Sequence, residues 1–127
     1  MSKPAPFLPH ILIVEDDPAY ADSLSRYLGA HNLRVTVAHA GSTGLVAHDC
    51  DPADIVLLDC KLPDMNGRQI LLDLRARNPR LPIMVVTAYP QEMNWGEVAL
   101  MLTRPIGPDA VYERLCPLLN GLPEGRR

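Results

Sequence analysis

The chain has 127 residues, a formal net charge of −3 and a hydrophobic content of 47%. This length suits one domain with a core of its own, and the mild charge gives no sign of nucleic-acid binding. No apolar run approaches the roughly 20 residues that cross a bilayer, so we expect neither direct nucleic-acid binding nor membrane insertion.

Composition also suggests how the chain is divided. The prolines of the first nine residues, which contain no hydrophobic signal segment, predict a disordered leader over 1–9. We expect one domain over 10–120 and a short tail over 121–127. Since little sequence follows the last predicted helix, a stand-alone module is expected, with a domain excised from a longer protein as the alternative.

The cysteines and histidines give no sign of a metal centre. The chain has three cysteines, an odd number with no CxxC pair. This count favours reduced thiols and a cytoplasmic location. The four histidines show no metal-ligand spacing, and we expect them at surface or boundary positions. The residues concerned are Cys50, Cys60, Cys116, His10, His31, His39 and His48.

Five short apolar runs predict strands. Four to six residues are too few for a helix core but suit strands buried on both faces of a parallel sheet. The second run alternates apolar and polar residues, which favours a place nearer the sheet edge. The runs are His10–Val14, Leu33–Ala38, Ile55–Leu58, Pro82–Thr87 and Val98–Leu102.

Helical patterns separate the strands. The first helix should begin near Pro18, with Asp16 or Asp17 as its cap, and should end near Gly29. Alternation of strands and helices predicts an α/β fold with a parallel sheet. Later helices are expected over Ser42–Asp49, after a turn at Asn66–Gly67 as far as Asn78–Pro79, and from about Gly107, where Pro117 predicts a kink or an early end. The segment Ala88–Gly96 is poorly patterned, so a helix there should be short or absent.

Polar residues end four of these strands. Glu15 and Asp16 follow the first strand, Asp59 ends the third, Thr87 ends the fourth and Arg104 follows the fifth. Ligands bind at the carboxyl edge of open α/β sheets. Three carboxylates that meet there repel one another unless a hard divalent cation such as Mg²⁺ lies between them. A phosphoryl group on Asp59 would then be surrounded by metal, hydroxyl and guanidinium.

In the order and spacing of these motifs, the chain resembles the receiver domain of two-component response regulators. The residues that carry the resemblance are 11–18 (ILIVEDDP), 54–59 (DIVLLD), 62–67 (LPDMNG) and 85–88 (VVTA). The resemblance covers about 10–119. It implies a flavodoxin-like (βα)5 three-layer sandwich around a five-stranded parallel sheet, and a role in phosphorelay signalling.

The resemblance also implies roles for single residues. Asp59 would accept a phosphoryl group from a histidine on a sensor kinase or a phosphotransfer protein. Glu15, Asp16 and Asp59 would hold Mg²⁺ together with the backbone carbonyl of Lys61. The chain would then be no enzyme in the usual sense, because it catalyses only its own phosphorylation and dephosphorylation.

Further roles concern the bound phosphoryl group. Thr87, the backbone N–H of Ala88 and Arg104 would contact its oxygens. Lys61 and Tyr89 stand where family members tune hydrolysis, and a cation and a bulky phenol there are expected to slow it.

The chain departs from the family pattern at two positions. Arg104 stands where lysine is usual, and its planar fork differs in shape from an ammonium. Met101 stands where a tyrosine or phenylalanine usually acts as a switch, and the stretch between Thr87 and Arg104 is several residues shorter than usual. We therefore expect phosphorylation to be kept and the readout, through an unknown protein target, to differ.

Three alternatives come from other classes of protein. The first is a pseudo-receiver that only docks on a partner, without phosphorylation. The second is a small phosphatase with an aspartyl-phosphate intermediate, but Lys61 stands where its second aspartate should be. The third is a dinucleotide-binding domain, which residues 15–18 (EDDP) oppose because no glycine-rich loop follows the first strand.

Overall fold

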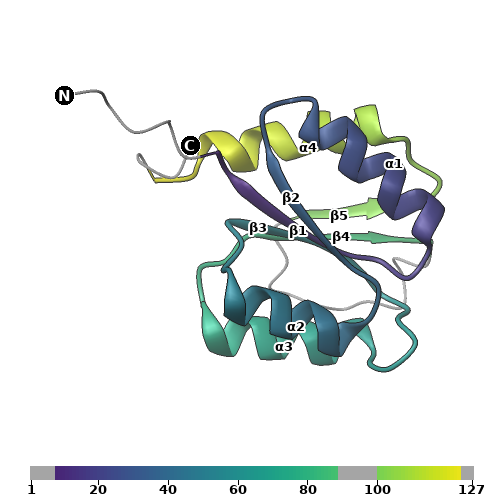
Figure 1. The fold of residues 1–127 in the computed structure, drawn as a ribbon, viewed down its shortest axis with the longest axis vertical. Coiled ribbons are helices and arrows are strands. Elements are labelled where there is room, and N and C mark those ends of the chain that lie inside the picture. The colour runs from purple at the N-terminus through teal and green to yellow at the C-terminus, as the bar shows by residue number, and fades with distance from the viewer. Residues whose placement is uncertain (1–7, 89–99, 124–127) are drawn as a thin grey trace.

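Five short strands pair in parallel in the order β2-β1-β3-β4-β5 (Figure 1). The structure is a computed structural model that describes residues 8–88 and 100–123. The chain crosses from one half of the sheet to the other between β2 and β3, so β1 and β3 lie side by side at its centre. The strands are β1 (His10–Val14), β2 (Arg34–Ala38), β3 (Ile55–Asp59), β4 (Ile83–Thr87) and β5 (Leu100–Thr103).

The central strands are apolar throughout because both of their faces are covered. Successive side chains of a strand point to opposite faces. Ile11 and Ile13 of β1 enter one hydrophobic cluster, and Leu12 and Val14 enter the other. Among the described residues, strand β2 pairs with β1 alone, and it is mostly half-buried, which confirms the edge position predicted from its alternating pattern.

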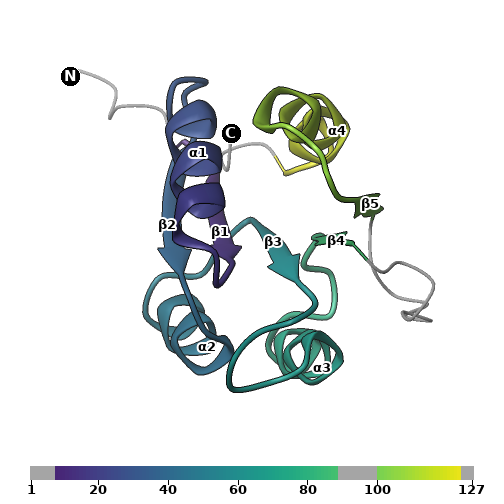
Figure 2. The same cartoon turned by 90° about the vertical axis from the view of Figure 1, so that its right-hand side faces the viewer.

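Two helices cover each face of the sheet among the described residues (Figure 2). Helices α1 (Pro18–Gly29) and α4 (Pro108–Asn120) lie on one face, and α2 (Gly41–Cys50) and α3 (Gly67–Arg77) lie on the other. The flavodoxin-like three-layer architecture is therefore confirmed. Residues 89–99 lie outside the described ranges, so the short or absent fourth helix stays a prediction. Within those ranges, no helix has the length and apolar character needed to span a membrane.

N-cap side chains fix where α1 and α3 begin. Asp17 is the N-cap of α1, and its Oδ1 accepts a hydrogen bond from Ala19 N at 3.0 Å. The turn predicted at Asn66–Gly67 instead opens α3: Asn66 Oδ1 accepts from Gln69 N at 2.8 Å, and Gly67 is the first helical residue. An asparagine side chain can serve a turn or a helix cap equally well, and here the cap is formed.

The early end predicted at Pro117 is wrong, because α4 continues to Asn120. A proline in the last turn removes only one hydrogen bond of a helix that stops soon afterwards. The closing N–H of Gly121 bonds to the carbonyls of Pro117 and Leu118, both at 3.2 Å.

Helix α2 lies unusually close to the sheet. A Cβ atom on Gly44 would lie 2.9 Å from Val14 Cγ2, so only glycine fits there without movement. The amino end of α2 is capped from a distance by Asp64, which accepts hydrogen bonds from Gly41 N at 2.7 Å and Ser42 N at 2.9 Å. Hydrogen bonds from Ser42 and Gly41 lower the pKa of Asp64 to about 2. The loop that follows Asp59 is thereby attached to α2.

Candidate functional site

Three carboxyl groups meet at the carboxyl edge of the sheet. Glu15 and Asp16 directly follow β1, and Asp59 ends β3, the neighbouring strand. The register pairs Val14 with Leu58, so the next residue of each strand reaches the edge together. Each of the three carboxyl groups offers an oxygen atom, and these atoms all lie within 4.8 Å of one another. Residues more than 40 positions apart thus form one acidic cluster.

Glu15 is held firmly although it is charged and buried. Its side chain is 3% exposed, and its Oε2 accepts a hydrogen bond from Asp17 N at 3.0 Å. Its Oε1 forms an ion pair with the guanidinium of Arg104. A buried carboxylate is stable only when its charge is balanced, and here Arg104 balances it.

The surroundings of Asp59 disfavour its ionised form. Its side chain is 12% exposed, and Lys61 N donates a hydrogen bond to Oδ1 at a distance of 3.4 Å. Burial raises the pKa of Asp59 to about 6, with a further increase from the Asp16 carboxyl, while hydrogen bonds from the backbone of Lys61 and Cys60 oppose the change. Near neutral pH this carboxyl therefore lacks full charge compensation.

Arg104 points into the acidic cluster. Besides its ion pair with Glu15, its Nη2 lies 4.0 Å from Asp59 Oδ1. The guanidinium carbon lies 4.4 Å from the centre of the Tyr20 ring, which is within cation–π range. Burial lowers the pKa of Arg104. Its buried Nε finds no hydrogen-bond partner among the described residues.

The remaining predicted residues lie on β4, on β5 and beyond. Thr87 is buried at the end of β4, beside β3, and its carbonyl accepts a hydrogen bond from Arg104 N at 2.8 Å. Ala88, the next residue, is exposed, as is Lys61 in the loop after Asp59. Met101 is half-buried and packs against the hydrophobic cluster on the α2–α3 side of the sheet. Tyr89 lies outside the described residues.

Sequence reasoning missed the part that Tyr20 plays. Its hydroxyl donates a hydrogen bond to Ile106 O at 2.9 Å, and its ring faces the guanidinium of Arg104. Burial raises the pKa of Tyr20, and the charge of Asp59 adds to this. The sequence position of Tyr20 could have indicated a place near the site, because Tyr20 lies in the first turn of a helix that starts at the carboxyl edge of the sheet. A cavity of about 700 Å³ adjoins Tyr20 and Arg104. It is lined by Tyr20, Ala88, Arg104, Pro105, Ile106, Gly107 and Pro108.

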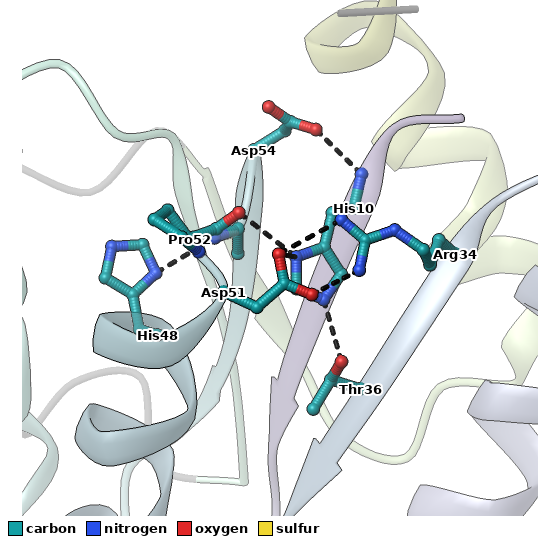
Figure 3. Close-up of polar contacts among 8 residues, drawn as sticks. His10, Arg34, Thr36, His48, Asp51, Pro52 and Asp54 are labelled. Carbon is teal, nitrogen blue, oxygen red and sulfur yellow. Dashed lines mark hydrogen bonds and ion pairs between the residues drawn. The ribbon is translucent and has the colours of Figure 1, made fainter. Parts of the chain in front are cut away.

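A second polar cluster lies at the opposite end of the sheet (Figure 3). His10 is 2% exposed, with Nε2 2.7 Å from Thr36 Oγ1 and Nδ1 3.1 Å from Pro52 O. His48 is buried too, and its Nδ1 accepts from Ala53 N at 3.1 Å. The surface or boundary position predicted for the histidines is therefore wrong for these two. Their ring nitrogens satisfy polar groups where β1, β2 and the α2–β3 loop meet.

Comparison with known proteins identifies the family. Residues 11–104 match the sequence profile described as the response regulator receiver domain. This chain is a receiver domain of that family. It is 38% identical over 78 residues to the probable transcriptional regulatory protein TcrX of Mycobacterium tuberculosis, a match that covers 61% of this chain and 33% of TcrX. It is 40% identical over 84 residues to the sensory transduction protein RegX3 of the same species, covering 66% of this chain and 37% of RegX3.

Solved structures agree with this assignment. A CheY-like receiver domain protein from Methanospirillum hungatei has a TM-score of 0.81 at 26% identity, covering 89% of this chain and 94% of that one. The Thermotoga maritima response regulator TrrA, solved with Mg²⁺ and BeF, has a TM-score of 0.79 at 21% identity, covering 87% and 99% of the two chains, and supports the fold alone. The receiver domain thus spans only about a third of the curated relatives above.

Proposed function

We propose that this receiver domain accepts a phosphoryl group on Asp59 and works in two-component signal transduction. In the reaction, a carboxylate oxygen of Asp59 forms a bond to phosphorus as the bond between phosphorus and a donor imidazole nitrogen breaks. The electron pair of the broken bond stays on the imidazole. The observation that carries this proposal is the meeting of Glu15, Asp16, Asp59 and Arg104 at the carboxyl edge of the sheet.

The donor set fits Mg²⁺. Oxygen ligands alone, supplied by crowded carboxylates, are the type that this ion prefers. Glu15, Asp16 and Asp59 would hold it with the backbone carbonyl of Lys61. When bound, Mg²⁺ would neutralise charge on the phosphoryl oxygens. The ion would also compensate the charge of the buried Asp59 carboxylate, whose raised pKa of about 6 supports the assignment.

The neighbouring residues have supporting roles. Thr87 and the backbone N–H of Ala88 would hydrogen-bond the phosphoryl oxygens, and Arg104 would balance their charge. Lys61 and Tyr89 would slow hydrolysis by limiting access of water to phosphorus. Met101 has no aromatic ring to move inward, so the signal would pass to its target by another route.

The partners follow from this chemistry. The phosphoryl donor would be a sensor histidine kinase or a histidine phosphotransfer protein, in the cytoplasm. TcrX is named as a transcriptional regulator, but the matched region is only 33% of its length, so DNA binding is not assigned to this domain. The downstream target would be a protein.

Intact mass spectrometry tests the proposal. The protein is incubated with acetyl phosphate and Mg²⁺, beside Asp59→Asn and the control Asp22→Asn, whose carboxyl is exposed on α1. We expect a mass gain of one phosphoryl group in the wild type and in Asp22→Asn, and none in Asp59→Asn. No gain in any protein, with Mg²⁺ at saturation, would refute the phosphoacceptor role.

A docking module without phosphorylation is the second candidate. The ion pair between Arg104 and Glu15 favours it, since a cation already satisfies one of the carboxylates. The raised pKa of Asp59 opposes it, because a pure docking module would be more stable with an apolar or amide side chain there. The mass experiment separates the two.

A further inference from the structure

Arg104 and a divalent cation make conflicting demands on the same carboxylate. Glu15 Oε2 accepts a hydrogen bond from Asp17 N, and Oε1 forms the ion pair with Arg104. Glu15 is 3% exposed, so it has little freedom to turn toward a second partner. A metal ion that binds Glu15 at Oε1 must therefore displace the guanidinium or accept a like charge beside it.

The surroundings of Arg104 provide a second position for it. Its Nη2 is already 4.0 Å from Asp59 Oδ1, and its buried Nε has no hydrogen-bond partner among the described residues. The Tyr20 ring beneath it can support the guanidinium in either position, since the ring attracts a cation across its whole face. The adjoining cavity of about 700 Å³ gives the side chain room to move.

We propose that Arg104 is an internal counter-ion that competes with the divalent cation for Glu15, so that metal binding moves its guanidinium from Glu15 toward Asp59. This rests on the proposed function, because it concerns the metal site described there. Metal binding would place the guanidinium fork beside the atom that accepts the phosphoryl group. The metal-free domain would in turn stay stable without a bound cation.

Competition has a measurable consequence for affinity. Removing the guanidinium charge frees Glu15 Oε1 and removes a like charge near the cation, and an energetic coupling of ordinary size between two such sites changes affinity roughly tenfold. We therefore expect Arg104→Gln to bind Mg²⁺ about tenfold more tightly than the wild type. Arg26→Gln is the matched control, since Arg26 is exposed on α1 and its guanidinium pairs with Asp22 at 2.9 Å.

The experiment is calorimetric titration of MgCl₂ into the metal-free proteins, with NMR of the arginine Nε–H signals of the wild type. We expect the Arg104 signal to shift on titration and the Arg26 signal to stay in place. The calorimetric titration and the shift of the Arg104 signal should give the same dissociation constant for Mg²⁺. Should Arg104→Gln fail to fold, Arg104→Lys is the second variant, and its affinity should exceed that of the wild type because the fork and the ring contact are lost.

The outcomes separate this inference from the proposed function. Equal or weaker binding by the Arg104 variant that folds, with clear binding by the wild type, overturns the competition and leaves the metal site in place. An Arg104 signal that does not respond to Mg²⁺, while the wild type binds the ion, also overturns the competition and leaves the metal site in place. Absence of Mg²⁺ binding in every variant overturns the metal site itself, and the competition with it.

Discussion

Replacement of Asp59 by asparagine removes a carboxyl group that is costly to ionise in the folded protein. The pKa of Asp59 rises from 3.8 to about 6, chiefly through burial. The folded protein therefore holds this proton more tightly than the unfolded chain does. By linkage, the free energy of unfolding falls as the pH rises from about 4 to about 6, and the full cost persists above that window.

The size of the effect follows from the same pKa. A rise from 3.8 to about 6 corresponds to at most about 3 kcal/mol. Part of the carboxyl reaches solvent, and screening reduces this to about 1–2 kcal/mol. We expect Asp59→Asn to be more stable than the wild type by that amount near neutral pH, and the two to be about equally stable near pH 3, where the carboxyl is protonated in most folded and unfolded molecules.

Urea unfolding followed by circular dichroism measures this difference. The proteins are compared in EDTA across the pH window, with Asp22→Asn as the exposed control. Saturating Mg²⁺ at neutral pH should then stabilise the wild type more than Asp59→Asn, because a ligand stabilises the state that binds it. A variant that is less stable than the wild type near neutral pH, or a difference that does not vary with pH, would refute the reasoning.

Three further predictions concern stability and can be checked by thermal or urea unfolding. Gly44→Ala should cost about 1–3 kcal/mol through overpacking, whereas Gly29→Ala, with nothing within 4 Å of the new methyl group, should cost nothing. Asp64→Asn should lower the melting temperature at neutral pH, and its difference from the wild type should narrow as the pH falls from about 4 to about 2, because the lowered pKa of Asp64 stabilises only the ionised form. Thr36→Val should cost about 1–3 kcal/mol, since it leaves Nε2 of the buried His10 unpaired.

The strands were predictable because burial on both faces leaves an unbroken apolar run in the sequence. The acidic cluster was predictable because parallel strands end at one edge, so residues 15, 16 and 59 had to meet there if the sheet formed. The residues at which helices begin and end were harder to predict. Asn66 and Pro117 are residues whose local preferences allow more than one structure, and the surrounding packing decides between them.

Side-chain partners across the fold could not be read from the sequence. Arg104 was expected near Asp59, but nothing local shows that it pairs with Glu15 and covers the Tyr20 ring. His10 begins an apolar run, and no spacing rule connects it with Thr36 or Pro52. Such contacts depend on how strands and loops from distant parts of the chain are aligned, which only the assembled sheet determines.

The cap that Asp64 places on α2 has a practical meaning for work on this domain. One carboxylate serves two N–H groups of a helix that lies 23 and 22 positions earlier in the chain. Spectroscopic labels or epitope tags inserted in the stretch 61–66 would therefore disturb α2 as well as the loop that carries them. Val46, which is 60% exposed on that helix, is a better attachment point for a spectroscopic label.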